Sequence, residues 1–259
     1  MGLTLLNRQK IELAGLDIGT AAVKLVRLNK TSNGYSLVSA VAEAIQPSVN
    51  DETLQRKNTL EAIRTCLQKS NWKNKSVVCG ISGPEAVVRG FTFPPLPETA
   101  IEQAIRMEAQ QVCPLDMTQS ELDFQLIETP QSAQTKTASK AKPRLGVMAI
   151  AGNRVIQERT SLLTEAGSKA LMVDVDALAM LNCLNELQFI EAQETVAVID
   201  IGSSLTNVVI YGSDGLPFVR NINHAGNTII QHISRDLDTP ENELWQRFTQ
   251  NLSTDPLND

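Results

Sequence analysis

The pattern of apolar and polar positions divides the first part of the chain into short elements. Apolar side chains crowd residues 12–28, and Gly19 interrupts them. This pattern predicts two strands joined by a tight turn at Gly19–Ala21, because a glycine between two apolar runs is typical of a hairpin. The Asn33-Gly34 pair predicts a second hairpin turn. The elements predicted next are a third strand over 35–44, a helix over 51–69 and a strand over 76–81.

A different pattern begins near Gly83 and indicates a small sheet with helices. The proline-rich stretch Phe91–Glu98 is unsuited to the continuation of a regular strand, and a charged segment with helical spacing follows it. Residues 129–143 include no large apolar side chain, so we expect a flexible loop between two strands. The elements predicted here are a helix over 98–112, strands over 121–128 and 144–151, and a helix over 153–166.

The last part of the chain passes again from strand to helix. Asp174 and Asp176 lie at this junction, where an aspartate can cap the N-terminus of a helix. Alternation then predicts three strands between residues 196 and 219, with a turn at 212–215, and a helix over 226–237. Because strands and helices alternate along the whole chain, we predict an α/β fold.

Composition and charge exclude several classes of function. The 259 residues carry a net charge of −6, and aromatic residues make up only 4%. A nucleic-acid-binding protein needs clustered Lys and Arg and aromatic side chains for stacking, so we expect no nucleic acid as the main partner. No apolar run approaches the roughly 18 residues of a membrane-spanning helix, and the start of the chain lacks the features of a signal peptide. Any contact with a membrane is therefore expected to be peripheral.

The cysteines favour a reducing compartment. Cys66, Cys79, Cys113 and Cys183 lie in apolar or helical contexts, and no two of them form a CxxC pair. We expect four reduced and mostly buried thiols, a state that fits the cytoplasm better than an oxidising compartment.

One motif occurs twice in the chain. The first copy, GLDIGTAAVK, begins at Gly15, and the second, VIDIGSSLTN, begins at Val198. Each copy consists of a strand, an Asp-x-Gly sequence, small hydroxyl residues and a second strand. A single Asp-x-Gly is usually only a turn, so the interpretation depends on the repeat. The corresponding residues are Asp17 and Asp200, Gly19 and Gly202, Thr20 and Ser203, and Lys24 and Asn207.

The repeated motif suits the binding of a polyphosphate. Glycine permits a tight turn and the close approach of another group. The amides and hydroxyls that follow it can donate hydrogen bonds to phosphate oxygens, and an aspartate at a strand end can hold magnesium through water. Two copies on facing sheets would clamp one polyphosphate from both sides. The prediction is that Asp17 and Asp200 are buried, since they serve one metal–phosphate site, and that Lys24 reaches the phosphates from the first copy only.

The two motifs resemble the phosphate-binding hairpins of the actin-like ATPase superfamily, and almost the whole chain resembles the PilM family of type IV pilus assembly. Residues 94–128 resemble the helix and strand of the inserted 1C subdomain, and residues 166–181 resemble the connecting helix. The resemblance implies an actin-like (ribonuclease H-like) ATPase fold with an incomplete second domain. The implied divisions are the first part of subdomain 1A (1–82), a 1C-like subdomain (83–168), a return to 1A with the connecting helix (169–194) and the start of domain 2 (195–259).

The resemblance also implies which residues would bind ATP and Mg²⁺. Asp176 lies where the connecting helix of the family carries an acidic residue near the catalytic water, although a helix cap explains this aspartate equally well. No glycine-rich segment for adenosine is found, so we expect weak or absent nucleotide binding and at most a weak ATPase. The implied phosphate-binding residues are Asp17, Gly19, Thr20, Lys24, Gly202, Ser203 and Thr206, the metal-binding residues Asp17 and Asp200, and the catalytic residues Asp176 and Asp200.

For function, the resemblance implies a scaffold of type IV pilus assembly and twitching motility, in the cytoplasm at the inner face of the inner membrane. Members of the family hold the N-terminal cytoplasmic tail of a bitopic PilN protein in a groove between 1A and 1C. Other platform proteins and the pilus motor ATPases are further expected partners.

Three alternatives use a related fold. The first is a sugar kinase-like phosphotransferase, which would need a substrate base in the cleft and a complete nucleotide site. The second is a GspL-like cytoplasmic domain of a type II secretion platform, which usually continues into a membrane-spanning helix. The third is an FtsA-like filament protein, which carries an amphipathic helix at its C-terminus.

Overall fold

The computed structural model describes residues 14–31, 34–48, 51–73, 76–127, 143–190, 194–212 and 215–252. The chain divides into two compact units, one formed by residues 1–81 and 154–175 and the other by residues 82–153 and 176–259. The subdomain boundaries implied by the resemblance stay a prediction. Among the described residues, no helix has both the length and the apolar character needed to cross a membrane.

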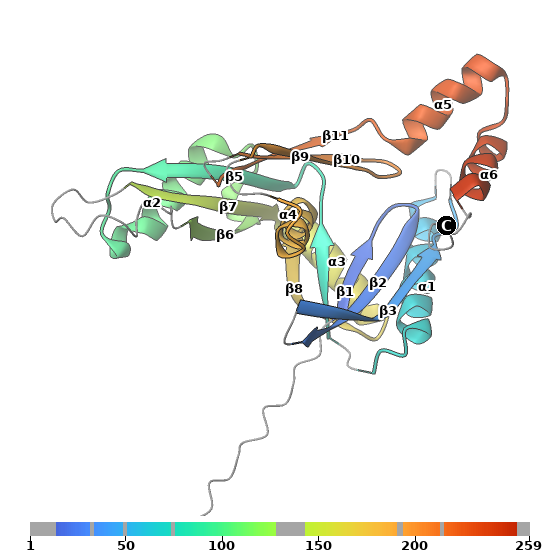
Figure 1. Cartoon of the computed structure of the whole chain (residues 1–259), viewed down its shortest axis with the longest axis horizontal. Helices are drawn as coiled ribbons and strands as arrows, with labels where there is room; N and C mark the ends of the chain where they lie inside the picture. Colours follow the sequence, from blue (N-terminus) through green and yellow to red (C-terminus); the bar gives the residue numbers. More distant parts are fainter. Residues whose placement is uncertain are drawn as a thin grey trace, which may run out of the picture. The chain divides into compact units, whose positions relative to one another are not determined.

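The first unit is built on a mixed sheet of five strands with two helices (Figure 1). Its elements are β1 (Ala14–Ile18), β2 (Ala22–Thr31), β3 (Gly34–Ala44), α1 (Glu52–Lys69), β4 (Ser76–Ile81), α3 (Asn153–Glu165) and β8 (Lys169–Val175). The strand order is β3-β2-β1-β4-β8. β1 pairs antiparallel with β2 and parallel with β4, and β4 pairs parallel with β8. The strands and helices predicted for this region are confirmed, and Asn33 of the second predicted turn lies outside the described residues.

The core of the first unit lies on one face of this sheet. In β1, Leu16 and Ile18 are buried, whereas Asp17 points to the other face and is exposed, because successive strand residues face opposite sides. Both helices pack against the buried face, α1 with Ile63 and α3 with Leu163, and neither of these side chains is exposed. α1 begins after Asp51, whose carboxylate accepts a hydrogen bond from the amide of Leu54.

The second unit contains two antiparallel sheets of three strands each. The elements of the first sheet region are β5 (Ala86–Phe93), α2 (Glu98–Val112), β6 (Ser120–Ile127) and β7 (Arg144–Gly152), with the strand order β5-β7-β6. α2 packs Ile101, Ile105 and Ala109 against Met148 and Ile150 of β7. The predicted helix and the strands β6 and β7 are confirmed. β5 was not predicted, because its apolar residues do not alternate cleanly with polar ones. The loop predicted over 129–143 lies, apart from residue 143, outside the described residues.

The second sheet, with the helices that precede and follow it in the chain, contains the second copy of the repeated motif. Its elements are α4 (Asp176–Glu186), β9 (Val196–Ile201), β10 (Thr206–Tyr211), β11 (Pro217–Ile222), α5 (Gly226–Leu237) and α6 (Glu241–Leu252), with the strand order β11-β10-β9. Val209 and Val219 are cross-strand neighbours on the buried face, while Phe218 and Ile210 are neighbours on the other, exposed face. The three predicted strands and the helix after them are confirmed.

The four cysteines are free thiols in different environments. Cys66 and Cys79 are buried, Cys113 is half-buried and Cys183 is exposed, so the expectation of mostly buried thiols is wrong for Cys183. Burial raises the pKa of the Cys66 thiol to about 11. Cys66 is therefore protonated at neutral pH and unreactive, and its thiol donates to the carbonyl oxygen of Val23.

Candidate phosphate-binding hairpins

The first hairpin joins β1 to β2 through a tight turn. The amide of Gly19 donates to the carbonyl oxygen of Ala22 at an N···O distance of 3.0 Å. A Cβ atom on Gly19 would lie 3.1 Å from that oxygen, so the turn favours glycine. Thr20 follows in the turn and is exposed. The turn predicted at Gly19–Ala21 is confirmed.

Asp17 and Lys24 face each other across the first hairpin. They are cross-strand neighbours in the β1–β2 register, and Lys24 Nζ lies 3.0 Å from Asp17 Oδ2. The prediction that Asp17 is buried is wrong, since its side chain is 48% exposed and that of Lys24 is 61% exposed. An exposed ion pair of this kind contributes little to stability, because water screens both charges.

The second hairpin joins β9 to β10 through the same kind of turn. The amide of Gly202 donates to the carbonyl oxygen of Leu205 at 3.0 Å, and a Cβ atom on Gly202 would lie 2.8 Å from that oxygen. Asp200 faces Asn207 in the β9–β10 register, at the positions that Asp17 and Lys24 occupy in the first hairpin. The internal repeat seen in the sequence is therefore a repeat of structure.

Asp200 and Asn207 form a half-buried polar pair. Asn207 is only 4% exposed, and its Nδ2 donates to Asp200 Oδ2 at 3.2 Å. The other polar atom of the Asn207 amide group, Oδ1, is buried and accepts no hydrogen bond from any residue that the structure describes. Asp200 itself is exposed, so the prediction that it is buried is also wrong. In this pair the buried residue is the asparagine, and the aspartate is the exposed one.

The start of α5 holds the turn of the second hairpin. The amide of Gly226 donates to the carbonyl oxygen of Gly202 at 3.0 Å, and the amide of Asn227 donates to that of Ser203 at 2.8 Å. The Ser203 hydroxyl donates to Asn227 Oδ1 at 3.0 Å, and Asn227 Nδ2 donates to Ser204 Oγ at 3.3 Å. Asn227 was not singled out from the sequence. A signal for it was present, since an asparagine directly after a glycine at a helix start can reach a neighbouring loop.

Thr206 anchors the far side of the same hairpin. It is 7% exposed, and its hydroxyl donates to the carbonyl oxygen of His224 at 2.6 Å. In this conformation the hydroxyls of Thr206 and Ser203 both donate within the protein. Their role in phosphate binding stays a prediction, and it would require these donors to change partners.

The two aspartates at the junction of β8 and α4 have different environments. Asp174 belongs to β8 in the first unit, and its carboxylate accepts a hydrogen bond from the amide of Val175 at 2.8 Å. Burial raises the pKa of Asp174 above its usual range. Asp176 is the first residue of α4, in the second unit. The prediction that Asp176 lies near a catalytic water stays untested.

The structure thus assembles each half of the predicted site within its own unit. Asp17, Gly19, Thr20 and Lys24 lie on one hairpin, and the second unit carries the corresponding hairpin. That Asp17 and Asp200 confront each other across one cleft stays a prediction. Searched over the described residues, the side chains of His, Cys, Asp and Glu form no group of three that could hold a metal ion directly. A magnesium ion held by one or two carboxylates, several waters and phosphate oxygens does not need such a group.

A family model described as type IV pilus assembly protein PilM matches residues 15–255. This chain belongs to the PilM family. The match spans both hairpins and the sheet region with α2 between them. The family places the protein in type IV pilus assembly, as the sequence resemblance implied.

Three solved structures match the chain, and the first of them shows the same fold. The PilM-PilN type IV pilus biogenesis complex matches with a TM-score of 0.73 and 23% identity, over 89% of this chain and 67% of that chain. The cytoplasmic domain of EpsL from the type II secretion system of Vibrio cholerae matches with a TM-score of 0.49 and 12% identity, over 81% of this chain and 71% of that chain. EutJ from Carboxydothermus hydrogenoformans, an ethanolamine utilization protein, matches with a TM-score of 0.48 and 11% identity, over 89% of this chain and 58% of that chain. The predicted α/β fold of the actin-like type is confirmed.

Proposed function

We propose that this PilM-family protein is a scaffold in the cytoplasm, at the inner face of the inner membrane, that binds the N-terminal tail of a PilN-like protein. The observation that carries the proposal is the family match over residues 15–255, together with the likeness to a PilM that was solved in complex with PilN. Pilus motor ATPases and other platform proteins are further partners of such a scaffold.

The apolar surface of α2 supports peptide binding. Ile101, Ile105 and Ala109 of α2 face the sheet, while Met107 and Val112 expose 55% and 40% of their surface to water. Exposed apolar side chains on a helix that is itself fixed to a sheet provide a rigid surface for a short peptide. We therefore propose that the PilN-like tail contacts Met107, the more exposed of the two.

The test is a titration with the tail peptide. A labelled synthetic peptide with the N-terminal cytoplasmic sequence of the PilN-like protein from the same organism is titrated with the whole chain, and fluorescence anisotropy is read. We expect saturable binding, weakened about ten-fold by Met107→Glu, because a charge replaces an apolar contact. Gln157→Glu adds the same charge at an exposed position of another helix, α3, and should leave binding unchanged. Absence of binding to the folded protein contradicts the proposal.

We further propose that the two hairpins hold the phosphates of ATP, weakly. Asp17, Gly19, Thr20 and Lys24 would contact them from the first hairpin, and Gly202, Ser203 and Thr206 from the second. Mg²⁺ would be held through water by Asp17 and Asp200, and Asp176 would orient the attacking water. Bound magnesium would neutralise the charge that develops on the phosphates.

Weak affinity is expected because the donors of the second hairpin are already engaged. The Ser203 and Thr206 hydroxyls donate to Asn227 and His224 within the protein. Calorimetric titration of the whole chain with ATP and MgCl₂ should give a dissociation constant well above the micromolar range. Micromolar affinity contradicts the expectation of weak binding, and an unchanged affinity in Lys24→Ala removes the first hairpin from the site.

A further inference from the structure

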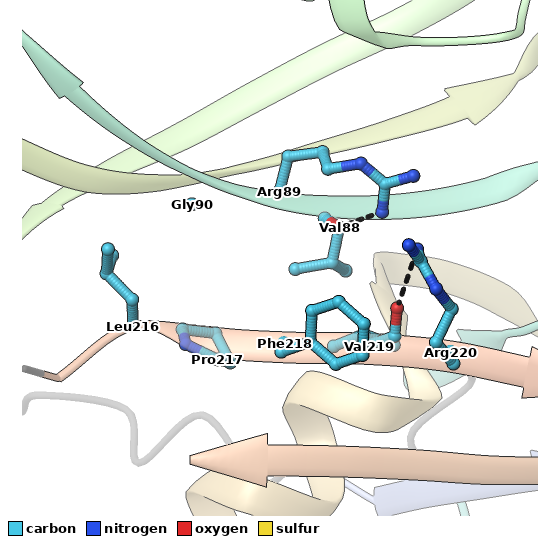
Figure 2. A pocket seen from close by; sticks show the side chains of 8 residues that line it. All are labelled: Val88, Arg89, Gly90, Leu216, Pro217, Phe218, Val219 and Arg220. Atoms are coloured by element: carbon cyan, nitrogen blue, oxygen red, sulfur yellow. Dashed lines mark hydrogen bonds between the residues drawn. The ribbon is translucent and has the colours of Figure 1, made fainter. Parts of the chain in front are cut away.

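A groove runs between two edge strands of the second unit (Figure 2). It has a volume of about 310 Å³ and is lined by residues 88–90 of β5 and residues 216–220 of β11. Each of these strands is the outer strand of its own sheet. A Cβ atom on Gly90 would lie 3.2 Å from the side chain of Leu216, so the two strands approach closely there. The groove therefore runs along two strand edges and is narrow where Leu216 meets Gly90.

The other end of the groove carries two positive charges. Arg89 and Arg220 extend into the same space from opposite strands (Figure 2). One Nη1–H of Arg89 donates to the carbonyl oxygen of Val88 at 3.0 Å, and one of Arg220 donates to that of Val219 at 3.5 Å. A guanidinium has five N–H donors, so donors remain on both side chains. In the described part of the chain neither guanidinium has a carboxylate partner within ion-pair distance.

The surroundings favour a ligand that is both anionic and apolar. The guanidinium carbon of Arg220 lies 4.6 Å from the centre of the Phe218 ring, and this stacking limits the freedom of the charged group. Phe218 is 49% exposed, so half of its surface is available to a ligand beside the charge. Val88 and Leu216 supply further apolar wall. An anion that bridges the two guanidinium groups would offset the repulsion between their positive charges.

We propose that this groove binds an extended acidic segment of a partner protein. A carboxylate of the segment would lie between Arg89 and Arg220 and accept hydrogen bonds from both, and an apolar residue beside it would cover Phe218. A slot between two strands suits an extended backbone better than a helix, which is about 10 Å wide. Arginine is the side chain whose planar fork matches a carboxylate. The inference goes beyond the tail-binding function, since it concerns different residues and a different ligand charge.

The test uses two labelled peptides that differ only in charge. The first has the sequence Ser-Glu-Val-Glu-Leu-Glu-Ser, and the second has glutamine in place of each glutamate. Fluorescence anisotropy with the whole chain should show binding of the acidic peptide about ten-fold tighter than that of its neutral counterpart, an advantage that shrinks at high salt. Arg220→Gln and Arg89→Gln should each weaken binding of the acidic peptide about five-fold or more.

Matched controls make each outcome decisive. Arg106→Gln removes an exposed arginine from α2 and should leave binding within about two-fold. Arg220 is exposed on its strand, so its variant is expected to fold even where Arg89→Gln does not. Equal binding of the two peptides, or equal losses in Arg106→Gln and Arg220→Gln, overturns the proposal. The proposal is also overturned if inorganic phosphate binds at the two arginines and the acidic peptide does not bind. Met107→Glu should weaken the PilN-like tail alone, which separates this inference from the proposed function.

Discussion

The two hairpins share a turn and differ in what holds it. Both have a glycine amide bonded to the carbonyl oxygen three residues on, and both place an aspartate opposite the residue seven positions later. In the first hairpin that residue is Lys24, which pairs with Asp17 in water. In the second it is Asn207, which is buried, and α5 adds further bonds to the turn. The Asp-x-Gly sequence therefore sets the turn, and the residue opposite the aspartate sets how firmly the hairpin is anchored.

The largest loss of stability is expected when Asn207, the residue opposite Asp200, is replaced with the lysine of the first hairpin. Asn207→Lys places an ammonium group at a position that is 4% exposed, and the cost of burying it should destabilise the protein by about 3 kcal/mol or more. Urea unfolding at pH 7, read together with hydrogen exchange of the β9–β10 amides, measures the loss. A loss below about 1 kcal/mol would mean that a lysine can pair with Asp200 as Lys24 pairs with Asp17, and that the hairpins are interchangeable.

The loss of stability on replacing each turn glycine with alanine should be larger where less space surrounds the glycine. A Cβ atom would lie 2.8 Å from a backbone oxygen at Gly202 and 3.1 Å at Gly19. We expect Gly202→Ala to cost about 2 kcal/mol, because backbone must shift, and Gly19→Ala about 1 kcal/mol. The same unfolding experiment compares the two variants. Equal losses, or a larger loss at Gly19, would contradict the view that the second turn is the tighter one.

The sequence predicted the turns because they depend on local chemistry. Gly19 and Gly202 interrupt apolar runs, and this spacing alone specifies a strand, a tight turn and a returning strand. Helix α2 could be predicted equally well, since its apolar residues recur at helical spacing and Pro114 follows it. These elements need no information from distant parts of the chain.

Burial of the motif residues could not be predicted in the same way. Asp17 lies between Leu16 and Ile18, and a carboxylate inside an apolar run suggests a buried functional group. The strand has only one buried face, however, and Asp17 lies on the other. Asn227 was missed for a related reason, because its bonds to the second hairpin depend on where α5 starts relative to β9 and β10. Strand β5 was missed because both of its faces carry apolar residues.

Removing the brace from α5 should loosen the second hairpin without unfolding it. Asn227→Ala deletes the side-chain hydrogen bonds to Ser203 and Ser204, and we expect a loss of about 1 kcal/mol. Hydrogen exchange should accelerate in the turn at Gly202 while the first hairpin keeps its exchange rates. A uniform effect on both hairpins would contradict a local role for Asn227.

The smallest effect should come from the first hairpin. Lys24→Asn gives it the residue that the second hairpin has, but at a site where the lysine side chain is 61% exposed. We expect the free energy of unfolding to change by less than about 0.5 kcal/mol, because an exposed ion pair contributes little. A double-mutant cycle with Asp17→Asn isolates the pair, and its coupling energy should be about 0.5 kcal/mol or less at low salt and lower still at high salt. A coupling above about 1 kcal/mol would mean that the Asp17–Lys24 pair stabilises the first hairpin about as much as burial and α5 stabilise the second. The choice of lysine or asparagine opposite the aspartate would then not decide how firmly each hairpin is held. A small coupling would mean that Lys24 can exchange Asp17 for a phosphate oxygen at little energetic cost, whereas Asn207 is held at a position that is only 4% exposed.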